Sequence, residues 1–167
     1  MKNLRHNRDL SELIPFLNAT ERQIIIYIAR NEKKETINAS QLAKNLDLPP
    51  STITSALRRM IETGKEKKNT NRPVDIGKIL NWKPRGNIKL TEFGRDVADC
   101  LERHHHVLEV FFKSTLNITA EEAHKESQEL GKVISCSLIK KMEETLELES
   151  DWGSYCICPQ HKKNNIC

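Results

Sequence analysis

The hydrophobic and polar positions of the chain first follow helical spacing at residues 21–31. Ile24, Ile25 and Ile28 lie on one face of this segment, as in a helix that packs against a core. Thr20 is the predicted N-cap, with a glutamine three residues on that completes a capping box. A second, shorter helix is predicted at "ASQLAKNL", and the prolines of "DLPP" end it because proline cannot continue a helix.

The third helix is predicted from "PSTITSALRRMIETG", where Gly64 is the expected C-terminal stop. Its apolar positions follow the spacing i, i+3, i+4, i+7, i+8 of an inward-facing stripe. These positions are Ile53, Ala56, Leu57, Met60 and Ile61. The opposite face carries small hydroxyl side chains near the start and two arginines one turn later. Two short helices joined by a tight turn, the second with such a face, indicate a helix-turn-helix.

After this helix the pattern changes to turn formers, basic residues and two short strands. "KILNW" and "NIKL" flank "KPRG", where proline and glycine favour a turn, so we expect a hairpin with Lys83 and Arg85 at its tip. A helix-turn-helix followed by a basic hairpin is a winged helix. Thr91 in "LTEFG" is the predicted N-cap of the next helix.

The rest of the chain is predicted to be helical. One long helix is expected from Glu92 to about Ser114, and two shorter ones in "NITAEEAHKESQELGKV", capped by Thr119, and in "ISCSLIKKMEETLELE". The large apolar residues of the long helix are Phe93, Val97, Leu101, Leu108, Phe111 and Phe112. Because three helices bury too little core to stand alone, we expect this part to dimerise.

The charge distribution supports two parts with different tasks. Residues 1–90 carry 18 Lys/Arg against 9 Asp/Glu, and residues 91–167 carry 9 against 14, giving net charges of +9 and −5. A basic part is typical of a protein that meets a polyanion, although basic surface also serves solubility. No run reaches the about 20 apolar residues of a membrane span. The N-terminus also lacks the apolar core of a signal peptide, so we expect a cytoplasmic protein with no membrane partner.

These patterns predict a mainly α fold in three parts: a winged helix-turn-helix DNA-binding domain at residues 1–90, an α-helical dimerisation domain at 91–149 and a cysteine-rich tail at 150–167. Short side chains let a recognition helix sit deep in the major groove, while arginines hold phosphates. The expected DNA-binding residues are Ser51, Thr52, Ser55, Arg58 and Arg59, with Lys83 and Arg85 at the wing. The expected partners are double-stranded DNA with a palindromic operator and a second copy of the chain.

The last twelve residues hold three of the five cysteines, in the spacing Cys156-x-Cys158-x2-His161-x5-Cys167. We call these four residues the tail ligands. Soft thiolates favour an iron–sulfur cluster or zinc over manganese or magnesium. Three alternatives remain open: an iron–sulfur cluster whose fourth ligand is His161, Cys100, Cys136 or a non-cysteine group; a Cys3His zinc site; or a thiol switch or disordered tail without metal. Cys100 and Cys136 themselves are expected to be small buried residues.

No enzymatic activity is expected. The chain shows no glycine-rich phosphate loop and no nucleophile–base pair, and no redox-fold pattern surrounds the tail cysteines.

The elements "LPPSTITSALRRM", "LTEFG", "ERHHHVLEVFF" and "AHKESQELGKVIS", in this order, resemble the metal-dependent repressors of the diphtheria-toxin-repressor and manganese-regulator (DtxR/MntR) family. The resemblance runs from roughly Thr20 to Leu146. It implies a winged helix, a helical dimerisation domain and repression that a divalent metal activates. One metal site of the family matches His105, Glu109 and His124, where i and i+4 share a helical face and the next helix adds a third ligand.

The family's regulatory metal site matches Gln128, Gly131 and Lys132, with one more ligand near Glu21 or Arg22. Glutamine is a poor ligand, glycine is none and lysine brings positive charge, so this site is expected to be lost. A regulator without its ion sensor still needs an input. We therefore expect the tail cysteines to hold an iron–sulfur cluster that reports iron or redox status. The alternative is a repressor gated by Mn, Fe or Zn at the first metal site.

Overall fold

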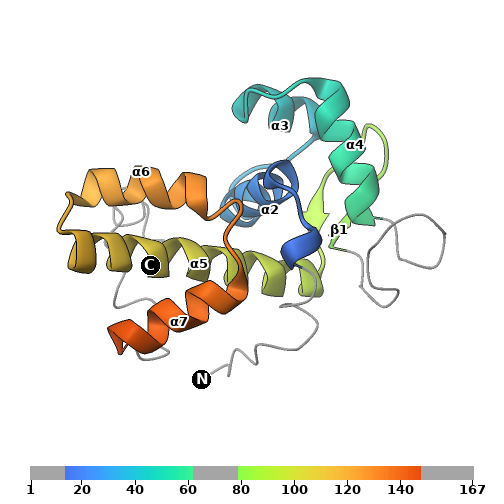
Figure 1. Cartoon of the computed structure of the whole chain (residues 1–167). Coiled ribbons are helices and arrows are strands. Elements are labelled where there is room, and N and C mark those ends of the chain that lie inside the picture. Colours follow the sequence, from blue (N-terminus) through green and yellow to red (C-terminus); the bar gives the residue numbers. More distant parts are fainter. Residues whose placement is uncertain (1–13, 62–78, 148–167) are drawn as a thin grey trace. The chain divides into compact units, whose positions relative to one another are not determined.

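The structure, a computed structural model of the chain, describes residues 14–61 and 79–147 (Figure 1). The chain divides into two compact units, one up to Asp99 and one from Cys100. Helix α5 (Glu92–Leu116) contributes residues to both units. The domain bounds expected from the sequence, with a boundary after residue 90, stay a prediction. Among the described residues, none of the helices combines the length and apolar character needed to cross a bilayer.

The first unit contains a helix-turn-helix and a small wing. Its elements are η1 (Ile14–Phe16), α2 (Ala19–Asn31), α3 (Ala39–Asn45), α4 (Pro50–Ile61), β1 (Leu80–Asn81), β2 (Lys89–Leu90) and the start of α5 (Figure 1). The two strands pair antiparallel, with Leu80 opposite Leu90. The Ile88 N–H donates to the Ile37 carbonyl at 2.8 Å, which ties the segment before α3 to the wing. Together with the helical second unit, this confirms the fold class predicted from the sequence.

Helix α2 begins two residues earlier than predicted. Its N-cap is Asn18, whose Oδ1 accepts from the Glu21 N–H at 2.9 Å, while Glu21 Oε2 accepts from the Asn18 N–H at 3.0 Å. The prediction of Thr20 as the cap was therefore wrong. Asn18 and Glu21 close the same kind of capping box earlier, and a carboxylate is a stronger acceptor than the amide of Gln23.

Helix α4 packs with the apolar stripe that the sequence predicts. Its buried residues are Ile53, Ala56, Leu57 and Met60, while Ile61 is half-buried. They join isoleucines of α2 and residues of both strands in the core of the first unit. The predicted stop of this helix, Gly64, lies outside the described residues.

The second unit consists of the remainder of α5 with α6 (Ala120–Leu130) and α7 (Cys136–Leu146). Thr119 caps α6 in a capping box with Glu122, as predicted. The core cluster of this unit is Val107, Leu108, Phe112, Ala123, Ile134 and Ile139, drawn from α5, α6 and the residues around α7. An ion pair between Arg103 of α5 and Glu143 of α7 adds a polar link beside this core.

Gly94 allows the first turn of α5 to lie directly against the backbone at Ile79. The Thr91 N–H and Oγ1 both donate to the Ile79 carbonyl, at 3.0 and 3.1 Å, and Thr91 Oγ1 accepts from the Gly94 N–H at 2.9 Å. Thr91 is thus the N-cap, as predicted. A Cβ on Gly94 would lie 1.9 Å from the Ile79 carbonyl oxygen. The glycine of "LTEFG" is therefore required by a close backbone approach.

Gly94→Ala is expected to lower the free energy of unfolding by roughly 1–3 kcal/mol, as when a methyl group is forced into filled space. This loss outweighs the about 1 kcal/mol by which alanine favours a helix interior over glycine. Urea denaturation followed by circular dichroism measures it. Gly86→Ala is the comparison variant: its Cβ would meet the Lys83 carbonyl oxygen at 3.1 Å, a tight contact that needs a smaller shift, so a smaller loss is expected. A Gly94→Ala protein as stable as the wild type would contradict the requirement for glycine.

Candidate functional site

The polar face of α4 is presented as a recognition helix requires. Its exposed members are Ser51, Ser55, Arg58 and Arg59, and Thr52 is half-buried. Arg59, however, has a structural partner: its Nε donates to Glu21 Oε1 at 2.9 Å, and the Glu21 side chain is only 1% exposed. This pair joins residues 38 positions apart, and sequence reasoning missed it. Of the two arginines expected to hold phosphates, Arg58 therefore fits the role better.

The predicted wing tip is a tight turn with two exposed basic residues, Lys83 and Arg85. The Gly86 N–H donates to the Lys83 carbonyl at 2.8 Å, which closes the turn with Pro84 at its second position. Arg85 follows with φ of 64°, the left-handed value that the third position of a type II turn requires. Glycine adopts this φ without strain, whereas arginine does not. The charged side chain at the tip therefore lowers the folding stability of the wing.

His105 and Glu109 of α5 and His124 of α6 converge in the second unit, and we call these three residues the triad. Glu109 Oε1 lies 3.0 Å from His105 Nε2 and 2.6 Å from His124 Nδ1, and the two nitrogens are 3.2 Å apart. Nitrogen and oxygen ligands bind first-row divalent metals at about 2.0–2.2 Å, which places adjacent ligand atoms about 3.0 Å apart in an octahedron and about 3.4 Å apart in a tetrahedron. The three atoms are therefore spaced to bind one cation.

Glu109 is a buried carboxylate whose charge the two histidines stabilise. Its residue is 0% exposed, against 4% for His105 and 9% for His124. Burial opposes ionisation, but the hydrogen bonds and charges of His105 and then His124 outweigh it and lower the pKa of Glu109 below its usual range. Within the described residues, Glu109 Oε2 is buried without a hydrogen-bond partner. A second acceptor atom thus remains for a cation, and the triad fits a divalent metal.

Gln128, one turn after His124 on α6, supports the triad from outside. Its side-chain amide nitrogen lies 2.8 Å from His124 Nε2, on the side of the ring away from Glu109. An amide can donate to this nitrogen or, after rotation, accept from it. Gln128 can therefore hold His124 in the tautomer whose Nδ1 lone pair faces a metal. Sequence reasoning placed Gln128 in a lost regulatory site and missed this role, although the i, i+4 spacing to His124 was visible.

The other positions matched to the family's regulatory site are engaged elsewhere. Gly131 is the C-cap of α6, and Lys132 Nζ pairs with Glu129 Oε1 at 2.6 Å. Glu21 closes the capping box of α2 and binds Arg59, while Arg22 donates to two backbone carbonyls before α2. In residues 14–61 and 79–147, potential ligands gather in two groups of three, and these positions belong to neither.

The second of these groups is Cys100, His104 and Cys136, all buried. Burial of the two cysteines agrees with the sequence prediction, but their grouping with His104 was missed. A hydrogen bond with Cys136 and burial raise the pKa of the Cys100 thiol, so the thiol is protonated in the metal-free protein. The tail ligands Cys156, Cys158, His161 and Cys167 lie outside the described residues, and the iron–sulfur cluster stays a prediction.

Comparison with known proteins matches both parts of the chain. Residues 91–150 match the family model of the iron dependent repressor metal binding and dimerisation domain, and residues 17–65 match that of a winged helix-turn-helix DNA-binding domain. An uncharacterized HTH-type transcriptional regulator of Methanocaldococcus jannaschii is 23% identical over 126 residues, which cover 75% of this chain and 90% of that protein.

Solved structures share the fold at low sequence identity. A manganese-dependent transcriptional repressor in complex with manganese gives a TM-score of 0.59 at 21% identity, over 77% of this chain and 53% of that one. A hypothetical protein from Sulfolobus solfataricus gives a TM-score of 0.59 at 21% identity, over 86% of this chain and 99% of that protein. T. acidophilum IdeR gives a TM-score of 0.54 at 14% identity, over 79% of this chain and 55% of that one. The chain spans about half the length of the named repressors, 53% and 55%, and nearly all of the Sulfolobus protein.

Both family models match in the order that the sequence motifs predict, and the second unit carries the triad at the matching positions. The chain therefore combines a winged helix-turn-helix domain with an iron dependent repressor metal binding and dimerisation domain, which confirms the resemblance to the DtxR/MntR family that the sequence motifs indicate.

Proposed function

We propose that this protein is a DNA-binding transcriptional repressor whose DNA affinity depends on a divalent metal bound by His105, Glu109 and His124. The observation that carries the proposal is the convergence of three buried ligand atoms from α5 and α6 within 3.2 Å of one another. A cation at this point would supply positive charge to Glu109 and link the two helices. The chain's own residues provide the three ligands, the orientation of His124 through Gln128 and, because the ligands are buried, the exclusion of water.

The donor set favours manganese, iron or zinc. Two imidazoles and one carboxylate suit first-row transition metals better than calcium or magnesium, which prefer oxygen. Two structural neighbours agree with this range: one is a repressor in complex with manganese, and another, ScaR, carries bound Zn²⁺ at 19% identity and a TM-score of 0.55. The divalent-metal reading is the better supported one because its ligands lie together in the described residues.

DNA binding is assigned to the first unit. The exposed hydroxyls of α4 would face base edges, Arg58 a phosphate, and Lys83 and Arg85 the backbone beside the minor groove. The net charge of +9 over residues 1–90 provides the long-range attraction to a polyanion. A protein of this kind acts where chromosomal DNA is within reach, which is the expected cytoplasmic location.

A homodimer is assigned to the second unit. Several large apolar side chains there are strongly exposed: Leu116 at 56%, Leu130 at 41%, Val133 at 67% and Leu138 at 45%. Exposed apolar groups of this size on a small helical unit are typical of an interface. A symmetric dimer presents two recognition helices, so the expected operator is palindromic.

Iron–sulfur sensing by the tail ligands is the second candidate. It depends on the cysteine spacing and on the soft character of the thiolates. It adds an input to the same repressor and does not replace the triad, so one experiment can separate the two.

The metal dependence can be measured on an operator selected from random duplex DNA in the presence of manganese. Manganese or zinc is expected to raise the affinity of the wild-type protein at least about tenfold, a coupling of about 1.4 kcal/mol. His124→Ala is expected to abolish the increase, and His106→Ala on α5 is the matched control. Serine at Cys156, Cys158 and Cys167 should leave the metal response intact. Metal-independent binding by the wild type, or an unchanged response of His124→Ala, would contradict the proposal.

The role of Gln128 can be tested by calorimetry with manganese. Gln128→Leu is expected to weaken binding about 10- to 100-fold, the usual effect of removing a residue that orients a metal-binding histidine. Gln128→Glu should retain or strengthen binding, because a carboxylate accepts from His124 Nε2 more strongly than an amide. Lys125→Leu, at an exposed position on the same helix, is the control. Equal affinities for all three variants would show that Gln128 does not orient the ring.

Replacing Arg85 at the wing tip is expected to have opposite effects on folding stability and on DNA binding. Arg85→Gly is expected to raise the free energy of unfolding by about 1 kcal/mol, since glycine adopts a positive φ without strain. The same change should weaken DNA binding and reduce the salt-dependence slope by about 1. Lys83→Ala is the control, because it removes a charge without relieving strain. Unchanged DNA affinity of Arg85→Gly would argue against a wing contact.

A further inference from the structure

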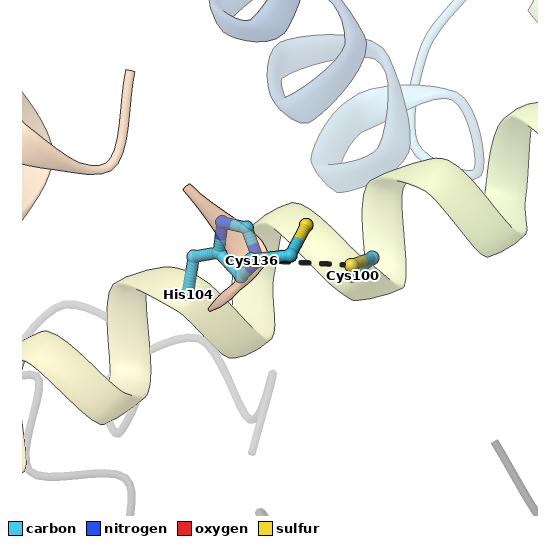
Figure 2. A group of neighbouring side chains, drawn as sticks. All are labelled: Cys100, His104 and Cys136. Atoms are coloured by element: carbon cyan, nitrogen blue, oxygen red, sulfur yellow. Dashed lines mark hydrogen bonds between the residues drawn. The ribbon is translucent and has the colours of Figure 1, made fainter. Parts of the chain in front are cut away.

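Cys100, His104 and Cys136 form a group of ligating side chains apart from the triad (Figure 2). Cys100 and His104 lie one turn apart on α5, and Cys136 is the first residue of α7. All three residues are buried, with exposures of 3%, 0% and 7%. Their ligand atoms lie within 4.8 Å of one another. Two sulfurs and one imidazole nitrogen therefore converge in the core of the second unit.

We propose that these three side chains bind a soft divalent cation, Zn²⁺ by chemistry, in a thiolate–imidazole site that joins α5 to α7. Zinc binds sulfur at about 2.3 Å and histidine nitrogen at about 2.0–2.1 Å, so a tetrahedral site separates sulfur and nitrogen by about 3.6 Å. Cys100 Sγ and His104 Nε2 are 3.8 Å apart. These two atoms need little movement to share one ion, and Cys136 supplies the third ligand from the other helix.

The state of the His104 ring is an independent observation in favour of a ligand. The ring is fully buried, and in the part of the chain that the structure describes its Nδ1 has no hydrogen-bond partner. Its Nε2 makes a 3.8 Å contact with sulfur, which is long and weak for a hydrogen bond. Burying an imidazole with so little compensation is unfavourable. A coordinate bond at Nε2 would replace the weak contact with sulfur, and the ring proton would then lie on Nδ1.

The charges around the group also suit a zinc ion. On binding, the two thiols lose their protons to solvent and two sulfur–metal bonds form, so two thiolates, one neutral imidazole and one divalent cation give a neutral buried centre. The neighbouring pair of Arg103 and Glu143 is itself neutral. Cys136 lies at the N-terminus of α7, where the helix dipole favours a thiolate.

Adjacent histidines on α5 thus serve two different sites. His105 faces the triad with α6, and His104 faces the two sulfurs with α7. The triad offers nitrogen and oxygen, whereas the second group offers mostly sulfur, so the two sites prefer different ions. The proposal of a thiolate site is independent of the repressor function, and either can fail without the other.

Cobalt(II) is the probe, because thiolate coordination gives an intense near-ultraviolet charge-transfer band. The parent protein is the full chain with Cys156, Cys158 and Cys167 changed to serine, which leaves Cys100 and Cys136 as its two thiols. Under reducing conditions we expect a band whose intensity at saturation corresponds to one thiolate-bound cobalt per chain, apart from any cobalt that the triad binds, and that zinc removes. Cys100→Ser and Cys136→Ser should each lose about half of the intensity or more, while Glu109→Gln should retain it.

A folded parent protein without the band would overturn the proposal, and this outcome does not depend on whether the serine variants fold. A band that persists in both Cys100→Ser and Cys136→Ser would overturn it as well. If the parent protein shows no cobalt band under reducing conditions and its mass falls by two hydrogen atoms on air oxidation, Cys100 and Cys136 form a disulfide and not a metal site. As a second readout, zinc should raise the melting temperature of the parent protein by more than that of Cys136→Ser, in which only the triad remains to bind the ion.

Discussion

The burial of the Glu109 carboxylate is the constraint on which the second unit depends. A carboxylate taken fully out of water carries a desolvation penalty of several kcal/mol unless opposite charge or strong donors surround it. His105 from the same helix and His124 from α6 provide those donors through one oxygen, and this fixes how α6 lies along α5. The other oxygen, without a partner among the described residues, leaves the compensation incomplete. A cation would complete it, so the proposed metal would contribute to the packing of this unit as well as to regulation.

Helix α5 is the element that both chemical groups share. Gly94 lets its first turn lie against the backbone at Ile79, its middle presents Cys100 and His104 toward α7, and the next residue, His105, turns toward α6. Successive positions on a helix differ by about 100°, so adjacent histidines must face different neighbours. Both ligand groups therefore draw residues from this one helix.

Local patterns in the sequence predicted most elements of the fold, because periodicity and capping act over three or four residues. Thr119 with Glu122 and Thr91 before Gly94 are of this kind, and the triad followed from an i, i+4 pair together with the resemblance to a family. The prediction of Thr20 as the N-cap was wrong because two capping boxes, Asn18 with Glu21 and Thr20 with Gln23, are both possible here. The sequence pattern alone does not show which of them forms. The pairs Arg59–Glu21 and Cys100–Cys136 span 38 and 36 positions, and only packing brings such residues together.

The spacing of the triad bears on which metal it selects. Affinity alone favours zinc over manganese or iron at a site of two imidazoles and one carboxylate, so selection must come from geometry. Tetrahedral zinc separates such ligands by about 3.4 Å, whereas an octahedral ion separates them by about 3.0 Å. The triad atoms lie at hydrogen-bond distances of 2.6, 3.0 and 3.2 Å, so binding an octahedral ion would require less displacement than binding tetrahedral zinc. A neighbouring thiolate site that takes zinc would reinforce the preference, because each ion then finds the donor set and the spacing that suit it.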